Sequence, residues 1–449
     1  MAAGCQNATS EQKNAPGTQQ HSFSAEKAAF AEKVKLEFLH AWSGYKKYAW
    51  GHDALKPLSK SYRDWYDQSL LMTPIDAFDT MILMGLEDEK NDCKQLILSE
   101  LTFDHDMSVQ VFEVVIRVLG GLLTAHQLDG DPQFLALAVD LADRLMPAFE
   151  TPTGMPYRMV NLKTGETNDH LNNPAEIGTL QLEFGLLSKL TGNPDYYATA
   201  KKAAVALFER RSDIGLVGTV IDVRTGEWTN TSSHISGMID SYYEYLLKCA
   251  MLFEDQDFAE MWEKSIKPVN QYLLDTAETG VWYTYADMHS GEKIKTQFGA
   301  LDAFMPALLA LGGDLETAKA VQASCFKMWS DFEIEPEQID YSNMEVLSGY
   351  YVLRPENIES AAYLFHYTGE RKYFDMGKQM FESIIKHCKT DEAYAELEDV
   401  RTMKQRDGLE SFFFAETMKY AFLLGSNQTT LDFTTTIFNT EAHPFLKTW

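Results

Sequence analysis

Six acidic residues recur along the 449-residue chain, each near the start of an apolar segment with helical periodicity. They are Glu113, Glu176, Asp240, Asp302, Glu356 and Glu410, at intervals of 63, 64, 62, 54 and 54 residues. Asp76 and Asp79 form an earlier pair. One acid at a helix start is explained by capping and by the helix dipole. Capping does not explain pairs of acids on one face of an apolar helix, such as Glu356 and Glu359, because buried like charges are costly. The surplus of acids indicates catalysis or a bound cation.

Carboxyl groups on opposite sides of a pocket are the groups that hydrolysis of a glycosidic bond requires. One carboxyl donates a proton to the departing oxygen, and another activates a water molecule. Crowding of like charges raises the pKa of one carboxyl above that of its neighbour, so a single residue type can supply both acid and base. Spacing alone does not say which acid takes which role.

The elements that carry these acids are predicted as pairs of antiparallel helices, separated by turn signals such as Gly130-Asp131-Pro132. The expected outer helices cover roughly residues 26–50, 90–101, 132–148, 194–209, 257–272, 314–330 and 371–387. The second helix of each pair is far more apolar, which is typical of an inner helix. Seven inner helices within seven outer helices predict an all-α (α/α)7 barrel. The N-termini of the inner helices, and their carboxylates, then meet at one mouth.

Residues 431–445 break the helical pattern. Their Thr-rich alternation predicts a β-hairpin with its turn at Asn439-Thr440-Glu441. Since an isolated hairpin is marginally stable in water, we expect it to pack on the barrel and to plug one end. Residues 26–449 are expected to form one domain, because no linker interrupts them. Residues 1–25 are expected to form a flexible polar tether.

Composition excludes several function classes. The chain has 39 Lys and Arg against 66 Asp and Glu, a net charge of −27, which argues against a nucleic-acid partner and against docking on anionic lipid. No apolar run reaches about 18 residues, so no transmembrane helix is expected. Ala2-Ala3-Gly4-Cys5 reads either as the end of a bacterial lipoprotein signal, with a lipid anchor at Cys5, or as a chance N-terminus. We expect an extracytoplasmic protein, periplasmic or at the cell surface, and a monomer.

Six motifs carry a family resemblance. VFEVVIRVLGGLL, AEIGTLQLEF, DSYYEYLLK, LRPENIES, ESFFFAETMKY and FNTEAHPF, in this order over about residues 30–446, resemble glycoside hydrolase family 47, the class I α-1,2-mannosidases. The resemblance implies an (α/α)7 barrel. It also implies a calcium-dependent, inverting enzyme that releases α-1,2-linked mannose from N-glycan-type oligosaccharides.

The resemblance also implies site residues. Glu356 resembles the general base, while Glu113 and Asp240 are both candidates for the general acid. Thr440 would bind Ca²⁺ through its hydroxyl and carbonyl oxygens, which suits a hard cation. Phe412 would lie under the mannose ring. The other residues expected to hold the sugar or calcium-bound water are Arg117, Glu176, Glu183, Glu337, Arg354, Glu359, Glu416 and Glu441. Glu416 is preferred to Glu410 because the two lie about 240° apart around a helix. His443 is expected to pack within the hairpin.

Three positions depart from the family pattern. Ala300 and Ala303 stand where the family usually carries His and Cys, so Cys325 would lack its disulfide partner. Met238 stands where endoplasmic-reticulum-type members carry Arg. Two alternatives stay open. One is a family member that binds mannosides with little or no hydrolysis. The other is a different α/α-toroid enzyme such as a sugar epimerase, a class that commonly uses His as acid and base.

Overall fold

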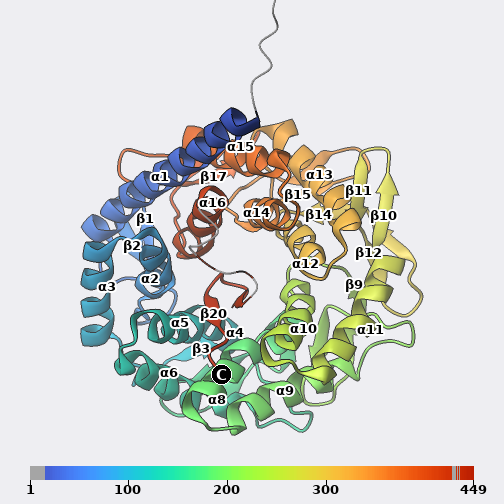
Figure 1. The fold of residues 1–449 in the computed structure, drawn as a ribbon. Coiled ribbons are helices and arrows are strands. Elements are labelled where there is room, and N and C mark those ends of the chain that lie inside the picture. Colours follow the sequence, from blue (N-terminus) through green and yellow to red (C-terminus); the bar gives the residue numbers. More distant parts are fainter. Residues whose placement is uncertain (1–15, 427–430, 432, 434) are drawn as a thin grey trace, which may run out of the picture.

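Two concentric rings of helices make up the fold (Figure 1). The computed structural model describes residues 16–426, 431, 433 and 435–449. Within these residues the seven outer helices are α1 (Pro16–Tyr48), α3 (Glu87–Glu100), α6 (Pro132–Leu145), α9 (Asp195–Phe208), α11 (Gln256–Tyr272), α13 (Leu315–Phe332) and α15 (Arg371–Cys388). A 3-10 turn, Met146–Phe149, follows α6.

The inner ring alternates with the outer ring along the chain. Its seven members in the described part are α2 (Met72–Met84); α4 (Val111–Glu113), continued by a π-helical segment (Val114–Leu119) and α5 (Gly120–Asp129); α7 (Pro174–Gly178) with α8 (Gln181–Thr191); α10 (Asp240–Phe253); the 3-10 turn Leu301–Phe304 with α12 (Met305–Leu311); α14 (Glu356–Thr368); and a second π-helical segment (Phe413–Thr417) with α16 (Met418–Gly425). Each contacts the next, and α16 contacts α2, which closes the ring. The predicted (α/α)7 barrel is confirmed.

Local capping chemistry sets the helix boundaries. Asp131, Asp255 and Asp314 cap α6, α11 and α13 by accepting hydrogen bonds from backbone N–H groups of the first turn. Gly130 and Gly369 end α5 and α14 in the left-handed conformation.

One predicted boundary is wrong. Helix α1 begins at Pro16, so residues 16–25 are helical rather than part of a tether, and residues 1–15 lie outside the described residues.

Short strands that the sequence pattern did not predict lie in the seven segments that lead from each outer helix to the next inner helix. They are β1 (Ala54–Lys56), β2 (Ser61–Arg63), β3 (Ser108–Gln110), β4 (Met159–Asn161), β5 (Thr167–Asn168), β6 (Leu171–Asn172), β7 (Val220–Asp222), β8 (Trp228–Asn230), β9 (Ser232–Ser233), β10 (Leu274–Ala277), β11 (Gly280–Tyr283), β12 (Tyr285–Asp287), β13 (Lys293–Lys295), β14 (Gln297–Gly299), β15 (Gln338–Asp340), β16 (Glu345–Ser348), β17 (Glu396–Asp399) and β18 (Lys404–Arg406).

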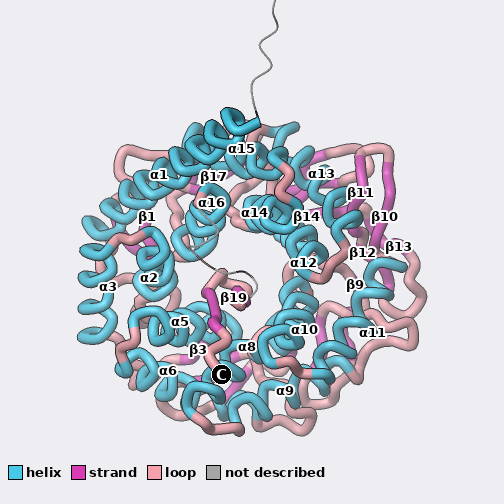
Figure 2. The backbone as a smooth tube through the Cα atoms, in the orientation of Figure 1, coloured by secondary structure: helices cyan, strands magenta, loops and turns pink. Residues whose placement is uncertain are grey.

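Most of these strands pair within one segment as short hairpins, and four strand pairs join successive segments. The antiparallel sheets β3-β4-β5, β6-β7-β8, β9-β12-β13 and β14-β15-β16 each join two neighbouring segments. Single bridges join Tyr351 to Leu397 and Leu55 to Leu409. Figure 2 shows these strands among the helices of the ring. The segments therefore form a connected belt around the end of the barrel where the inner helices begin.

The C-terminal hairpin consists of β19 (Thr436–Phe438) and β20 (Pro444–Leu446), paired with Ile437 opposite Phe445. Its base lies beside the end of α5, where the Gln127 side chain bonds both the N–H (3.0 Å) and the C=O (2.8 Å) of Leu446. Its tip lies near the start of the same inner helix, where Asn439 bonds the carbonyl of Ile116. Residues 116 to 127 span about 16 Å along the helix axis. The hairpin thus enters from the end opposite the belt and plugs the barrel, as predicted.

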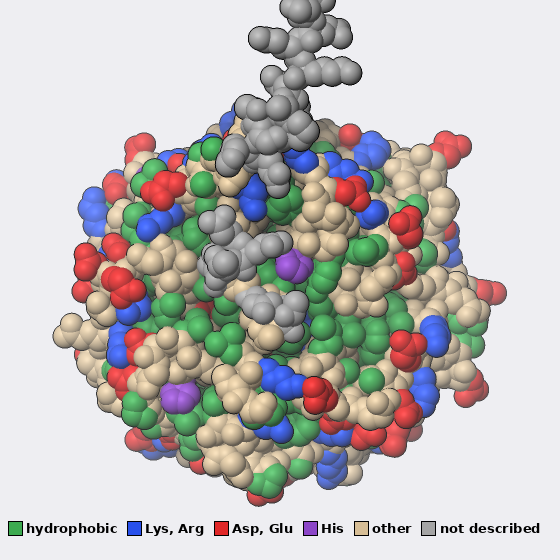
Figure 3. All heavy atoms as spheres, in the orientation of Figure 1, with side chains coloured by type: hydrophobic (Ala, Val, Ile, Leu, Met, Phe, Trp, Pro, Cys, Tyr) green, Lys and Arg blue, Asp and Glu red, His purple; other side chains and the backbone are tan. Residues whose placement is uncertain are grey.

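Apolar side chains fill the space between the two rings. Figure 3 shows hydrophobic side chains gathered toward the centre of the hairpin face and charged ones around its edge. One helical stretch of the described chain, Val111–Asp129, is as long and apolar as a membrane span, and 72% of its most apolar window is buried. It is an inner helix of the barrel, and its length and hydropathy follow from that position.

We expect Phe38→Ala in α1 to lower the free energy of unfolding by about 3–5 kcal/mol, because it removes a buried aromatic ring. Phe38 is fully buried and packs edge-on against Phe414 of the last inner helix, at 5.4 Å between ring centroids. Chemical denaturation followed by circular dichroism measures the change. Leu36→Ala on the same helix is the control, since Leu36 is 58% exposed and should change stability little. Equal decreases in the free energy of unfolding of the two variants would contradict this account of ring packing.

Candidate functional site

The starts of the inner helices and the hairpin tip surround one cavity of about 370 Å³. In the described part of the chain its lining includes eight carboxyl groups: Glu113, Glu176, Asp240, Glu244, Glu356, Glu359, Glu416 and Glu441. Arg117, Arg158 and Arg354 also line it, together with Phe112, Phe304, Phe412, Met238 and Thr440. The cavity therefore brings together three predicted catalytic acids, Thr440, and most of the predicted binding residues.

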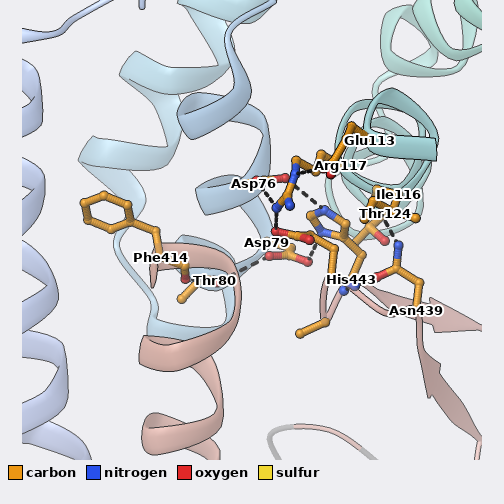
Figure 4. A network of polar contacts seen from close by, with 12 residues as sticks. Asp76, Asp79, Thr80, Glu113, Ile116, Arg117, Thr124, Phe414, Asn439 and His443 are labelled. Carbon is orange, nitrogen blue, oxygen red and sulfur yellow. Dashed lines mark hydrogen bonds and ion pairs between the residues drawn. The ribbon is translucent and has the colours of Figure 1, made fainter. Parts of the chain in front are cut away.

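Arg117 is the main positive charge on the side of the hairpin tip. Its Nε donates to Glu113 at 2.9 Å, and its guanidinium pairs with Glu441. Burial alone would lower the pKa of Arg117, but the carboxylates of Glu441, Glu113 and Asp76 raise it above its usual value. Figure 4 shows Arg117 lying between Glu113 on its own helix and Asp76 of α2. Arg117 thus holds Glu113 in a fixed orientation and joins the hairpin tip to the inner ring.

Asp240 and Glu356 have the electrostatics expected of proton-transfer groups. Burial, together with the nearby charges of Glu244, Asp302 and Glu356, raises the pKa of Asp240 to about 8. Burial also raises the pKa of Glu356 to about 7, although Arg354 opposes the shift. The Oε2 atom of Glu356 is buried and has no hydrogen-bond partner among the described residues. Both groups can therefore exchange protons near neutral pH.

Three further acids crowd the cavity. Burial and the charges of Glu441, Glu356 and Glu359 raise the pKa of Glu416 well above its usual value. Burial likewise raises the pKa values of Glu359 and Glu441. Glu359 accepts a hydrogen bond from the Tyr420 hydroxyl at 3.0 Å. Repulsion among these groups favours either protons or a bound cation between them.

Glu176 is held by its neighbours at the start of α7. Arg158 donates from Nε to both of its carboxylate oxygens, at 3.0 and 2.9 Å, and Asn173 donates to one of them at 2.8 Å. The Glu176 N–H donates in turn to the Asn173 side chain, which caps the helix. Glu176 is therefore preorganised, with its charge balanced by Arg158.

Phe412 faces the cavity, whereas the next two residues, Phe413 and Phe414, are buried core. The Arg117 guanidinium lies 5.9 Å from the centroid of the Phe412 ring and 5.0 Å from that of Trp65. An aromatic ring that lines a cavity offers a surface on which a sugar ring can stack. Glu416 lines the cavity, as predicted, and Glu410 instead bonds Arg63 and Trp65 outside it.

Two predicted binding residues lie outside the cavity. Glu183 is fully buried and accepts hydrogen bonds from the Tyr245 hydroxyl (2.6 Å) and from Asn439 (2.8 Å). Glu337 pairs with Arg354 at 2.7 and 3.1 Å, and so holds that arginine at the cavity. Neither residue lines the cavity, so their predicted role in holding the sugar or calcium-bound water stays a prediction. Glu337 lies behind Arg354, which lines the cavity. The two hydrogen-bond partners of Glu183 do not line it.

His443 of the hairpin does not line the cavity and packs against α2. Its ring is fully buried between Asp79 (2.9 Å) and Asp76 (3.3 Å) of α2 (Figure 4). Burial opposes protonation, but the two aspartates raise the pKa of His443 to about 9. Lys419 of α16 donates to Asp79 at 3.0 Å and to the Ala442 carbonyl at 2.6 Å. Asp76 and Asp79 thus anchor the hairpin instead of facing the cavity.

Several cavity residues were missed by sequence reasoning. Glu244 lies one helical turn after Asp240 and pairs with the buried Lys248, so the spacing that relates Glu113 to Arg117 could have found it. Arg158 and Asn173 lie in the segment before α7 and carry no periodic signal. Cys325 is buried and free, as are Cys93, Cys249 and Cys388.

Carboxyls gathered in one cavity, at the mouth of an α/α barrel, are the groups that a glycoside hydrolase requires. Residues 37–447 match the description "Glycosyl hydrolase family 47". The chain belongs to this family, and the resemblance seen in its motifs is confirmed.

Named relatives and one solved structure agree with this family assignment. The chain is 37% identical over 447 residues to "Alpha-mannosidase I MNS5" of Arabidopsis thaliana, covering 93% of this chain and 77% of the relative. It is 36% identical over 442 residues to the human "Endoplasmic reticulum mannosyl-oligosaccharide 1,2-alpha-mannosidase". That match covers 91% of this chain and 62% of the relative. The "alpha-1,2-mannosidase from Trichoderma reesei" superposes with a TM-score of 0.87 at 29% identity, covering 93% of this chain and 99% of that one.

The raised pKa values of Asp240 and Glu356 predict a pH-dependent stability. Their ordinary values are 3.8 and 4.5, so between about pH 5 and pH 8 the folded protein holds protons that the unfolded chain has released. Stability therefore falls as pH rises through this window. We expect the free energy of unfolding, measured by urea denaturation with chelator present, to decrease from pH 5 to pH 8.

Asp240→Asn should make this decrease shallower, because the amide does not titrate. Glu227→Gln, which removes an exposed carboxyl that does not line the cavity, is the control and should leave the slope unchanged. A slope that is identical in wild type and Asp240→Asn would contradict the assignment of a raised pKa to Asp240.

Proposed function

We propose that this chain is an inverting, calcium-dependent exo-α-1,2-mannosidase that releases mannose from mannosyl oligosaccharides. The observation that carries the proposal is the single cavity that gathers Glu113, Asp240 and Glu356 beside Thr440. The names of the relatives support the linkage and the sugar. A closed-ended pocket of this size suits removal of a terminal sugar.

The residues around the hairpin tip fit a calcium ion. Thr440 lines the cavity, and neither its hydroxyl nor its carbonyl oxygen has a hydrogen-bond partner among the described residues. Calcium takes about 6–8 oxygen ligands, including carbonyls and waters. The carboxyls of Glu359, Glu416 and Glu441, which repel one another, would hold calcium-bound waters. When bound, Ca²⁺ would supply a Lewis-acid contact for sugar hydroxyls.

The chain's own groups perform the hydrolysis. Phe412 stacks against the mannose ring, and Arg117, Arg354 and Glu176 orient its hydroxyls. Glu356 accepts a proton from water, whose oxygen bonds to the anomeric carbon. Glu113 or Asp240 gives a proton to the departing oxygen on the opposite side as the glycosidic bond breaks. Attack from the face opposite the leaving group inverts the anomeric configuration.

The two alternative functions are less well supported. A binding protein without hydrolysis would not need Asp240 and Glu356 with pKa values near neutrality. An epimerase would be expected to place His at the site. No His lines the cavity within the described residues.

We propose further that the protein works outside the cytoplasm, where its glycan substrates occur, as the names of its endoplasmic-reticulum relatives suggest. The lipid anchor at Cys5 lies outside the described residues and, like the monomeric state, stays a prediction.

Glu356→Gln should lower kcat by about 10²–10⁴-fold, because the general base is lost, while KM changes little. Hydrolysis of α-1,2-mannobiose measures both constants, and proton NMR of the first product identifies the anomer. Glu410→Gln removes an acid outside the cavity and serves as the control, with kcat near the wild-type value. Near-normal turnover by Glu356→Gln would remove Glu356 from its role.

A second substrate, compared with α-1,2-mannobiose, separates the two candidates for the general acid. A 2,4-dinitrophenyl α-mannoside has a leaving group that departs without a proton, so loss of the general acid is largely masked. Whichever of Glu113→Gln and Asp240→Asn is slow on mannobiose but fast on this substrate lacks the general acid.

Chelation should abolish activity, and Ca²⁺ should restore it. Mg²⁺ should restore it poorly, because Mg²⁺ demands a smaller, octahedral site. At a Ca²⁺ concentration 100 times its Kd, the folded protein should gain about 2.7 kcal/mol of stability. Differential scanning fluorimetry with EDTA, and then with each cation, measures the shift. Full activity in EDTA-treated, calcium-free enzyme would contradict the proposed cofactor.

A further inference from the structure

The hairpin tip is held by a buried hydrogen-bond network that the proposed reaction does not itself use. Asn439, which is 1% exposed, lies immediately before Thr440 in the turn. Its side-chain oxygen accepts from the N–H groups of Glu441 (3.0 Å) and His443 (2.8 Å), which shapes the turn. Its side-chain nitrogen donates to the Ile116 carbonyl (2.9 Å) and to Glu183 (2.8 Å). Both oxygen lone pairs and both N–H donors of Asn439 are thus used.

Local helix geometry prepares the partner of Asn439. Ile116 lies in the π-helical segment Val114–Leu119, where the regular hydrogen-bond ladder is interrupted. Figure 4 shows the Asn439 side chain reaching this helix beside Ile116. Gly120 provides the space, because a Cβ atom there would lie 2.7 Å from the Asn439 side-chain nitrogen. The inner helix is therefore shaped to receive this one amide.

A second contact fixes Thr440 itself. The Thr440 N–H donates to the Tyr245 hydroxyl at 3.3 Å, and that hydroxyl donates to Glu183 at 2.6 Å. Glu183 thus accepts from Asn439 and from Tyr245 on the same oxygen, Oε1. These bonds restrain the backbone on both sides of the Thr440 carbonyl and leave its two oxygens without protein partners in the described chain.

We propose that Asn439, Glu183 and Tyr245 are positioning residues that hold the hydroxyl and carbonyl of Thr440 toward a cation. This inference rests on the proposed function, because that function supplies the Ca²⁺. Groups that orient a metal ligand, without touching the metal, change metal affinity when they are removed. The network then gives the buried Glu183 a role although it does not line the cavity.

The hairpin offers a matched control. Gln127 holds the base of the hairpin through both the N–H and the C=O of Leu446, whereas Asn439 holds the tip. Asn439→Ala and Gln127→Ala each remove one side-chain amide from the hairpin and leave the net charge unchanged. A purely structural role for Asn439 would lower the melting temperature in both variants and leave Ca²⁺ affinity unchanged in both.

Isothermal titration calorimetry of the chelator-treated full chain with CaCl₂ is the test. We expect Asn439→Ala to raise the Kd for Ca²⁺ about 10–100-fold and Gln127→Ala to change it less than about twofold. Tyr245→Phe removes only the hydroxyl. This variant should raise the Kd about fivefold, as expected for the loss of one hydrogen bond. It replaces Asn439→Ala as the test variant if Asn439→Ala does not fold.

The outcomes separate this inference from the proposed function. If the wild-type chain binds no Ca²⁺, the proposed cofactor is wrong and the inference is overturned with it. If the wild type binds Ca²⁺ and Asn439→Ala or Tyr245→Phe binds it with wild-type affinity, only the positioning role is overturned. A Gln127→Ala variant that loses as much affinity as Asn439→Ala would also overturn it, because general hairpin stability would then account for the effect.

Discussion

Crowding of carboxyl groups in one small, largely buried volume is the constraint on which the rest of the structure depends. The described cavity lining has eight carboxyls and three arginines. Such an excess of negative charge raises the pKa values of several acids, because each ionised group destabilises the next. Glu416 is the extreme case, facing Glu441, Glu356 and Glu359 together. The same repulsion supplies a protonated acid for catalysis and an attraction for a cation.

The barrel topology makes this crowding unavoidable. All inner helices run in one direction, so acids near their starts converge at one end. The belt of short strands joins the seven segments at that end and holds the helix starts in a fixed ring. The hairpin enters from the opposite end and carries Thr440 and Glu441 to the cavity floor. Arg117 connects the two halves, since it pairs with Glu113 on the ring and with Glu441 on the hairpin.

Helix pairs could be predicted from the sequence, and several site positions could not. Capping residues such as Asp131 and Asp314 act within one turn, so the sequence shows them directly. The i,i+7 spacing of Glu176 and Glu183 would place both on one face of an unbroken helix. The helix is interrupted between α7, which ends at Gly178, and α8, which begins at Gln181, so that relation does not hold. The belt strands are only two to four residues long, which leaves no periodic pattern to read.

The sequence by itself determined the order and boundaries of most helices, the apolar character of the inner ring, and the presence of an acid near each inner helix start. These properties depend on residues within a few turns of one another. Only the tertiary structure decided which carboxyls face the cavity and which lie behind it. His443 between Asp76 and Asp79, and Arg117 against Glu441, are contacts across more than 300 residues. Such contacts depend on ring closure and on the depth of the hairpin, and a local sequence pattern records neither.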